Sequence, residues 1–159
     1  MVRNVLFVCT GNICRSPLAE ALLKRALEER GLNDVSVTSA GTGAWDGAPA
    51  SEGAYLVGLE CGLDLSGHRA RLLSRELVEQ ADLILTMARH HRARVDELGG
   101  EGRVHVLGEF ARREDPDVEV SDPFGGDLGV YRDTCVELTT LAAAVAERLA
   151  EEAKRGDQR

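Results

Sequence analysis

Short apolar runs alternate along the chain with longer segments in which apolar residues recur every three or four positions. The short runs are typical of buried strands, and the longer segments are typical of helices with one apolar face. Strands are therefore predicted at residues 3–8, 35–39, 82–87 and 104–107. Helices are predicted at residues 17–30, 49–61, 76–80, 88–98 and 130–155. This alternation predicts an α/β fold in which a parallel sheet carries helices on both faces.

The chain is predicted to form a single domain over residues 1–159. Its 159 residues are enough for a sizeable core, and they contain no internal repeat, linker or low-complexity segment. Residues 40–48 are predicted to form a loop around the single tryptophan, Trp45, and residues 111–129 form a second, long and polar loop. The charged tail at about residues 151–159 is expected to fray.

Composition narrows the function classes. Hydrophobic residues make up 43% of the chain and charged residues 29%, which is typical of a soluble globular protein. No apolar run approaches the roughly 18 residues that cross a bilayer, and the N-terminus lacks a signal-peptide pattern. We therefore expect a cytoplasmic protein that does not engage a membrane. The formal net charge of −8 argues against a nucleic-acid partner.

The four cysteines, at positions 9, 14, 61 and 135, do not form a metal-binding pattern. The chain has no CxxC motif, and none of the cysteines has a histidine nearby at zinc-ligand spacing. A cytoplasmic setting favours reduced thiols. The sequence therefore predicts no metal site.

The most informative segment follows the first predicted strand, where Cys9 ends the apolar run and Arg15 follows after five residues. Backbone N–H groups of such a loop can surround a phosphate, and the helix that opens behind the loop adds the positive end of its dipole. In that setting Cys9 is expected to be a thiolate nucleophile, and Arg15 is expected to bind two phosphate oxygens. The intervening residues, which would bind phosphate, are Thr10, Gly11, Asn12, Ile13 and Cys14. The predicted reaction is phosphomonoester hydrolysis through a phosphocysteine intermediate.

A cysteine at a strand end can also be no more than a small buried hydrophobe. The neighbouring residues favour the phosphate loop. Gly11 and Asn12 are the residue types that best tolerate a left-handed backbone. Ser16 is a suitable helix N-cap, and Pro17 fits the first helical turn.

Hydrolysis also needs an acid that protonates the leaving oxygen and later accepts a proton from water. The long polar loop offers two carboxylates, Asp115 and Asp122, each followed by proline. Asp115 lies in a charged run that is typical of a solvated surface. Asp122 is followed by Phe124, an aromatic ring suited to an aromatic leaving group, so we choose Asp122 as the general acid. An ordinary Asp-Pro turn is the alternative interpretation.

Taken together, these segments resemble the low-molecular-weight protein tyrosine phosphatase family, bacterial type, over nearly the whole chain. The matching pieces are the loop from Cys9 to Ser16, residues 39–42, Trp45, residues 68–71 and residues 122–125. The resemblance implies a four-stranded parallel sheet, with Cys9 as nucleophile, Arg15 binding phosphate and Asp122 as general acid. It also implies a phosphorylated protein as substrate, and a monomer or weak dimer.

The resemblance implies supporting roles for further residues. Asn12, Ser39 and His68 are expected to form hydrogen bonds that support the loop. Ser16 is expected to donate a hydrogen bond to the sulfur and to ease its departure in the second step.

The resemblance also assigns the walls of the cleft and a redox role. Trp45 and Phe124 match the aromatic walls of the family's substrate cleft, although the position after Phe124, often a second aromatic in tyrosine-directed members, is Gly125 here. Cys14 matches a second loop cysteine that can form a reversible disulfide with the nucleophile, and simple packing is the alternative role. No metal or organic cofactor is required, because arginine and the backbone amides supply the electrostatic stabilisation.

Three other functions are weighed. A sister branch of the family acts on phosphoarginine, and the chain resembles it around residues 122–126 and at Tyr131. That branch typically has threonine where this chain has Ile13, so phosphotyrosine is favoured. Arsenate reductases of related fold relay oxidation through cysteines that residues 83–98 lack here. A non-catalytic phosphopeptide-binding module would not need Asp122.

Overall fold

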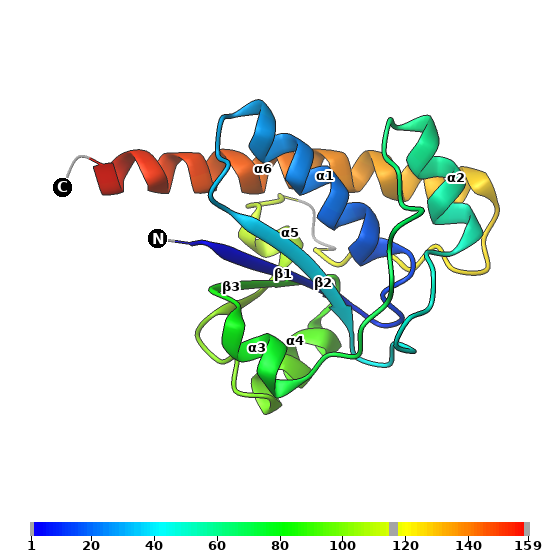
Figure 1. Ribbon diagram of the computed structural model, residues 1–159, viewed down its shortest axis with the longest axis horizontal. Coiled ribbons are helices and arrows are strands. Elements are labelled where there is room, and N and C mark those ends of the chain that lie inside the picture. Colours follow the sequence, from blue (N-terminus) through cyan, green and yellow to red (C-terminus); the bar gives the residue numbers. More distant parts are fainter. Residues whose placement is uncertain (1, 115–117, 158–159) are drawn as a thin grey trace.

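The computed structural model describes residues 2–114 and 118–157. Its centre is a four-stranded parallel sheet in the order β2-β1-β3-β4 (Figure 1). The strands are β1 (Asn4–Cys9), β2 (Ser36–Gly41), β3 (Leu83–Thr86) and β4 (Val104–Val106). The predicted four-stranded parallel α/β fold is confirmed, and β1 lies in the middle of the sheet with partners on both sides.

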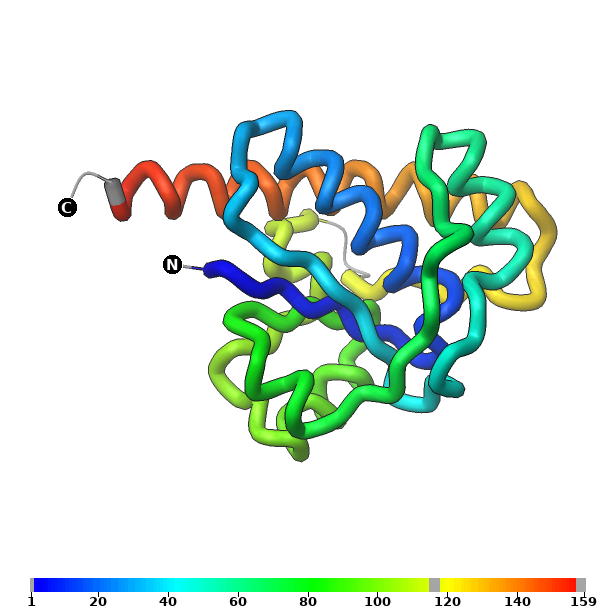
Figure 2. Tube along the Cα trace, viewed as in Figure 1, coloured from blue at the N-terminus to red at the C-terminus, as the bar shows by residue number. Residues whose placement is uncertain are grey.

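Helices cover both faces of this sheet, as predicted. On one face lie α1 (Arg15–Glu29) and α6 (Leu128–Asp157), and on the other lie α3 (Arg75–Gln80) and α4 (Arg89–Glu97) (Figure 1). The helix α2 (Glu52–Glu60) packs against α1 and α6. The tube in Figure 2 shows α6 running back to the end of the molecule where β1 begins.

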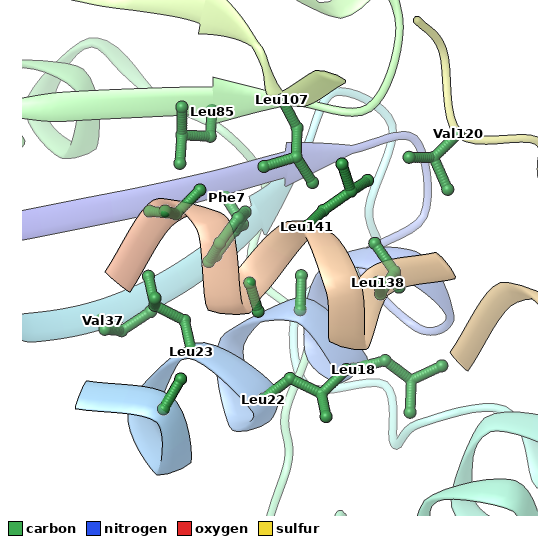
Figure 3. Packing of buried hydrophobic residues seen from close by; sticks show 14 of the residues in the cluster. Phe7, Leu18, Leu22, Leu23, Val37, Leu85, Leu107, Val120, Leu138 and Leu141 are labelled. Carbon is green, nitrogen blue, oxygen red and sulfur yellow. The ribbon is translucent and has the colours of Figure 1, made fainter. Parts of the chain in front are cut away.

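Side-chain alternation along β1 explains the two layers. Val5 and Phe7 belong to the larger core beneath α1 and α6, whereas Leu6 and Val8 belong to the smaller core beneath α3 and α4. Because successive side chains of a strand point to opposite faces, a strand buried on both faces is apolar throughout. Figure 3 shows the larger core, in which side chains of the sheet gather with those of α1 and α6.

Several element boundaries differ from the prediction. The helix α1 begins at Arg15, so Ser16 is not its N-cap; the N-cap is Cys14, and the Ser16 hydroxyl bonds elsewhere. The helix α2 begins three residues later than expected, because the Oγ of Ser51 accepts a hydrogen bond from the Ala54 N–H and caps the helix there.

Two further differences concern the strand ends. The short helix α5 (Leu107–Phe110) follows β4 directly. The sequence predicted no helix between the fourth strand and the loop that begins at residue 111. The strand β2 extends to Gly41, two residues beyond the predicted end, because it pairs with β1 as far as Cys9. Within the described residues, no helix has the length and apolar character needed to cross a membrane.

Candidate active site

The candidate nucleophile lies at the carboxyl end of the central strand. Cys9 is the last residue of β1, and residues 10–14 form the loop that leads into α1. The Cys9 side chain is buried, and its Sγ accepts a hydrogen bond from the Asn12 N–H at 3.3 Å. The Oγ of Ser16 lies 2.9 Å from the same sulfur. Two polar groups of the loop and of α1 thus converge on the sulfur of Cys9.

Asn12 holds the loop together from beneath. Its φ of 55° is left-handed, a conformation that asparagine tolerates better than most residues. Its side-chain amide donates to the Oγ of Ser16 at 2.8 Å and to the Oγ of Ser39 at 2.9 Å, and its Oδ1 accepts from the Arg71 N–H at 2.9 Å. The Nε2 of His68 lies 2.6 Å from the Asn12 carbonyl oxygen and donates to it. The structure therefore brings together Asn12, Ser39 and His68, the expected supporting residues.

These bonds also settle the direction of two hydroxyl groups. The Oγ of Ser16 accepts from Asn12 and keeps its proton available, and it donates that proton to Cys9 when the sulfur is a thiolate, which has none to give. The Oγ of Ser39 likewise accepts from Asn12 and donates to Oε1 of Glu20 at 2.8 Å. Asn12 and Ser16 are completely buried, so their side chains lie under the loop and not at its open side.

Arg15, the candidate phosphate-binding residue, is positioned by the chain before Asp122. Its Nη1 donates to the carbonyl oxygen of Val120 at 2.9 Å, and Val120 is itself tied to the end of β3 by a hydrogen bond from its N–H to the carbonyl of Met87. Nη2 of Arg15 lies 3.6 Å from Oδ2 of Asp122. Asp122, distant in sequence from Cys9 and Arg15, thus meets them at one edge of the sheet.

Asp122 faces this site from a turn. Its Oδ1 accepts a hydrogen bond from the Phe124 N–H at 3.1 Å, which is the Asx turn that an Asp-Pro pair favours. Its side chain is half exposed, so the carboxyl group remains in contact with water. The alternative acid, Asp115, lies outside the described residues.

A cavity of about 360 Å³ opens above Cys9. It is lined by Cys9, Thr10, Gly11, Ile13, Cys14 and Arg15 of the loop, and by Gly43, Trp45, Asp122 and Phe124. The Trp45 side chain is 84% exposed and that of Phe124 is 66% exposed, which is unusual for aromatic residues of this size. Two aromatic rings on the rim of a cavity that ends at a thiol and a guanidinium suit a flat, aromatic phosphate ester.

The end of β2 packs directly on the loop backbone. The N–H groups of Thr42 and Gly43 donate to the carbonyl oxygens of Cys9 and Thr10, both at 2.9 Å. A Cβ at Gly41 would collide with the Thr10 carbonyl oxygen, so only glycine permits this approach. Backbone hydrogen bonds therefore join the segment that leads to Trp45 to the segment that begins at Cys9.

Comparison with known proteins agrees with this geometry. A family model described as "Low molecular weight phosphotyrosine protein phosphatase" matches residues 4–155. The chain belongs to this family. As a low molecular weight phosphatase, it is a hydrolase. Some of its relatives are named protein-tyrosine-phosphatases and others protein-arginine-phosphatases.

Relatives of both kinds are similar to this phosphatase. The protein-arginine-phosphatase of Bacillus subtilis (strain 168) is 40% identical over 148 residues, which are 92% of this chain and 96% of that protein. The low molecular weight protein-tyrosine-phosphatase Wzb of Escherichia coli (strain K12) is 44% identical over 126 residues, 78% of this chain and 80% of that protein. A structure of the YwlE arginine phosphatase, a mutant with a phosphorylated active-site serine, superposes with a TM-score of 0.85 at 38% identity, covering 92% of this chain and 95% of that one.

The sequence did not single out His91, a buried residue of α4 that supports the phosphatase loop. Its Nδ1 accepts a hydrogen bond from the Ala88 N–H at 3.1 Å, so the ring proton is on Nε2, which donates to Oγ1 of Thr10 at 2.9 Å. Burial, with smaller contributions from His90 and Arg15, lowers the pKa of His91 to about 3. His91 is therefore neutral, and it presents Thr10 to the cavity and to Nη2 of Arg15, 3.5 Å away.

Cys14, the second cysteine of the phosphatase loop, is surrounded by hydroxyl groups. Its Sγ lies 3.2 Å from the Oγ of Ser51 and 3.5 Å from the OH of Tyr131, and these two oxygens are 3.3 Å apart. Burial raises the pKa of Cys14, and burial together with the bond to Cys14 raises the pKa of Tyr131 to about 12. Cys14 is therefore held as a thiol, in a setting different from that of Cys9.

The sequence assigned no role at the site to a backbone carbonyl, a helical carboxylate and two hydroxyl groups, although it noted Tyr131 as a point of resemblance to the arginine-directed branch. Val120, Glu20, Ser51 and Tyr131 reach the site only after distant elements have packed together. Glu20, three positions after Pro17, carried a weak signal as an acidic residue near the start of a helix.

Proposed function

We propose that this phosphatase hydrolyses phosphotyrosine in proteins through a phosphocysteine intermediate. The observation that carries the proposal is the convergence of Cys9, Arg15 and Asp122 on one cavity with aromatic rings on its rim. The thiol and the guanidinium are buried, whereas the carboxyl group of Asp122 is half exposed, which suits a leaving group that departs toward solvent.

In the first step the Cys9 thiolate attacks phosphorus. The S–P bond forms while the bond from phosphorus to the tyrosine oxygen breaks, and protonated Asp122 gives its proton to that oxygen. Arg15 and the loop N–H groups neutralise the charge on the three other phosphate oxygens. The Thr10 hydroxyl accepts bonds from His91 and Arg15, so its own proton is directed to a phosphate oxygen.

In the second step water attacks the phosphorus of phosphocysteine. The Asp122 carboxylate takes a proton from the water, a P–O bond forms, and the S–P bond breaks to return the thiolate. The Ser16 hydroxyl donates to the departing sulfur, because that sulfur leaves as a thiolate and has no proton of its own. Phosphate then leaves the cavity.

We further propose a reversible disulfide between Cys9 and Cys14. A hydroperoxide would oxidise the Cys9 thiolate to a sulfenic acid, and Cys14 would attack that sulfur and release water. Both sulfurs line the same cavity, which supports the pairing. Burial raises the pKa of Cys14, so this residue is the thiol partner and Cys9 the one that is oxidised first. The disulfide predicts that a thiol reductant restores activity after mild oxidation.

A protein-arginine phosphatase is the second candidate, because relatives with that name match almost the full chain. The rim of the cavity favours tyrosine instead. Ile13 lines the cavity with an apolar side chain that makes no hydrogen bond to a guanidinium group, and Trp45 and Phe124 offer stacking surfaces to a phenol ring.

The test of the nucleophile is turnover of an aryl phosphate by the wild type and by Cys9→Ser. We expect Cys9→Ser to lose at least about a thousandfold in kcat while it still binds inorganic phosphate. Cys61→Ser is the matched control, since it makes the same substitution outside the cavity and should keep wild-type turnover. Retained turnover in Cys9→Ser would contradict the mechanism.

A further inference from the structure

The two cysteines outside the phosphate loop lie next to each other. Cys61 follows the last residue of α2, and Cys135 lies in α6, 74 positions later in the chain. Their Sγ atoms are 2.8 Å apart, and both are thiols. A disulfide bond is about 2.05 Å long, so the sulfurs need to approach by only about 0.8 Å to form one. Neither thiol has a part in the proposed hydrolysis.

Neighbouring contacts hold the two cysteines in place. Glu60, just before Cys61, forms a bidentate ion pair with Arg132 of α6. The shorter of its two bonds, from Nε of Arg132 to Oε1 of Glu60, is 2.7 Å long. Nη1 of Arg25 donates to the carbonyl oxygen of Cys61 at 2.6 Å. These contacts fasten the end of α2 to α6 and α1, which lie side by side in Figure 1. The closeness of the sulfurs is therefore part of a packed interface.

The two thiols differ in their access to solvent. Cys61 is partly exposed, whereas Cys135 is 1% exposed. Burial, followed by the bond to Cys61, raises the pKa of Cys135 to about 12. An oxidant from solution therefore reacts first with Cys61, and the buried Cys135 is the resolving thiol that attacks the oxidised sulfur.

We propose that Cys61 and Cys135 form a second dithiol–disulfide couple, which a hydroperoxide oxidises to a bond between α2 and α6. The Cys61 thiolate attacks one peroxide oxygen, the O–O bond breaks, and Cys61 becomes a sulfenic acid while an alcohol or water leaves. Cys135 then attacks the Cys61 sulfur, the S–S bond forms, and the sulfenic oxygen leaves as water with the Cys135 proton. The peroxide gains the two electrons that the two thiols lose.

This disulfide would secure the helix pair that surrounds Cys14. Ser51, the N-cap of α2, and Tyr131, one turn before Cys135, both contact the Cys14 sulfur. The bond would also close a loop of about 75 residues in the unfolded chain, which stabilises the folded state. We expect the oxidised protein to unfold about 5 to 10 °C above the reduced protein.

The test uses a Cys9→Ser, Cys14→Ser double variant, in which Cys61 and Cys135 are the remaining cysteines. After treatment with hydrogen peroxide, we expect the intact mass of the monomer to fall by two hydrogen atoms and both thiols to disappear. Dithiothreitol should restore both thiols and reverse the rise in the unfolding midpoint. Non-reducing peptide mapping of the oxidised wild type should show the same Cys61–Cys135 link, which keeps the test independent of the folding of the double variant.

Cys135→Ser in the double-variant background is the control that sets the peroxide dose. Without its partner, Cys61 should gain oxygen atoms instead of losing hydrogen. The double variant that retains Cys135 is then treated at that same dose. The proposal is overturned if both of its thiols survive, if it gains oxygen, or if it forms a disulfide between two molecules.

Discussion

At the scale of single residues, Asn12 and Asp122 contribute in opposite ways. Asn12 is fully buried, and both N–H donors and the oxygen of its side-chain amide form hydrogen bonds, so it sets the shape of the loop. Asp122 is half exposed, and within the part of the chain that the structure describes it is oriented by the short Asx turn and the ion pair with Arg15. A buried, fully hydrogen-bonded loop and a solvent-exposed acid suit a reaction in which the phosphate stays in place while the leaving group departs.

Replacing Asp122 tests its role as acid. In Asp122→Asn, we expect kcat for phenyl phosphate, whose leaving group needs a proton, to fall by about 10² to 10⁴. An activated nitrophenyl phosphate should lose far less, because its leaving oxygen is a weak base. Asp127→Asn is the matched control, since its Oδ1 accepts a hydrogen bond from the Val130 N–H that an asparagine can also accept. Equal losses on both esters would point to another acid.

At the scale of elements, the site depends on how closely β2 approaches the loop after β1. Parallel pairing places Cys9 opposite Gly41, and the chain then continues along the loop backbone through two hydrogen bonds. This approach positions Trp45 at the rim of the cavity. It also joins Ser39, near the end of β2, to the amide of Asn12.

A Cβ at residue 41 should disturb this approach. We expect Gly41→Ala to lower the free energy of unfolding by about 1 to 3 kcal/mol, because the new methyl group meets the Thr10 carbonyl, which is backbone. Turnover should fall as well, since the loop must shift. Gly43→Ala is the control: its Cβ would meet Thr10 only at 4.0 Å, an ordinary contact. Urea unfolding of both variants measures the difference, and equal stabilities would contradict the packing described here.

Local patterns and long-range packing differ in how far the sequence predicts them. The strand that ends at Cys9 and the loop up to Arg15 were predicted because each rests on residues close in sequence. The turn at Asp122 was only the alternative interpretation of its Asp-Pro pair, and the structure has that turn beside the proposed acid. The start of α1 was misplaced, because the Ser16 hydroxyl bonds to Cys9 and Asn12 instead of capping the helix. The bond from Arg15 to Val120 spans 105 positions, and no local pattern indicates such a contact.

At the scale of the whole molecule, the loop is supported from both faces of the sheet. Glu20 of α1 reaches it through Ser39 on one face, and His91 of α4 reaches it through Thr10 on the other. Parallel α/β sheets bind ligands beyond the carboxyl ends of their strands, and this site lies at that edge. The integrity of the site therefore depends on the packing of both helical layers.

His91 makes the stability of the whole molecule depend on pH. The pKa of His91 is about 3 in the folded protein, whereas an ordinary histidine, as in the unfolded chain, has a pKa of about 6.5. Between pH 3 and pH 6.5, therefore, this side chain is protonated in the unfolded chain but not in the folded protein. The free energy of unfolding should therefore fall as pH drops through this window, by about 2 kcal/mol between pH 7 and pH 5.

Urea unfolding of the wild type and of His91→Gln at both pH values isolates this effect. Burial also lowers the pKa of His105, and this contribution is common to both proteins. We expect the variant to be less stable at pH 7 and to lose less on acidification. An equal loss in both proteins would show that His91 is not the buried neutral group described here.

The most direct test of the proposed substrate is phosphate release from matched phosphotyrosyl and phosphoarginyl peptides by the wild type and by Ile13→Thr. The account predicts that the wild type prefers phosphotyrosine and that the threonine hydroxyl shifts the preference toward phosphoarginine. A wild-type preference for phosphoarginine would contradict it. The part of the rim at Phe124, and not Ile13, would then decide the substrate.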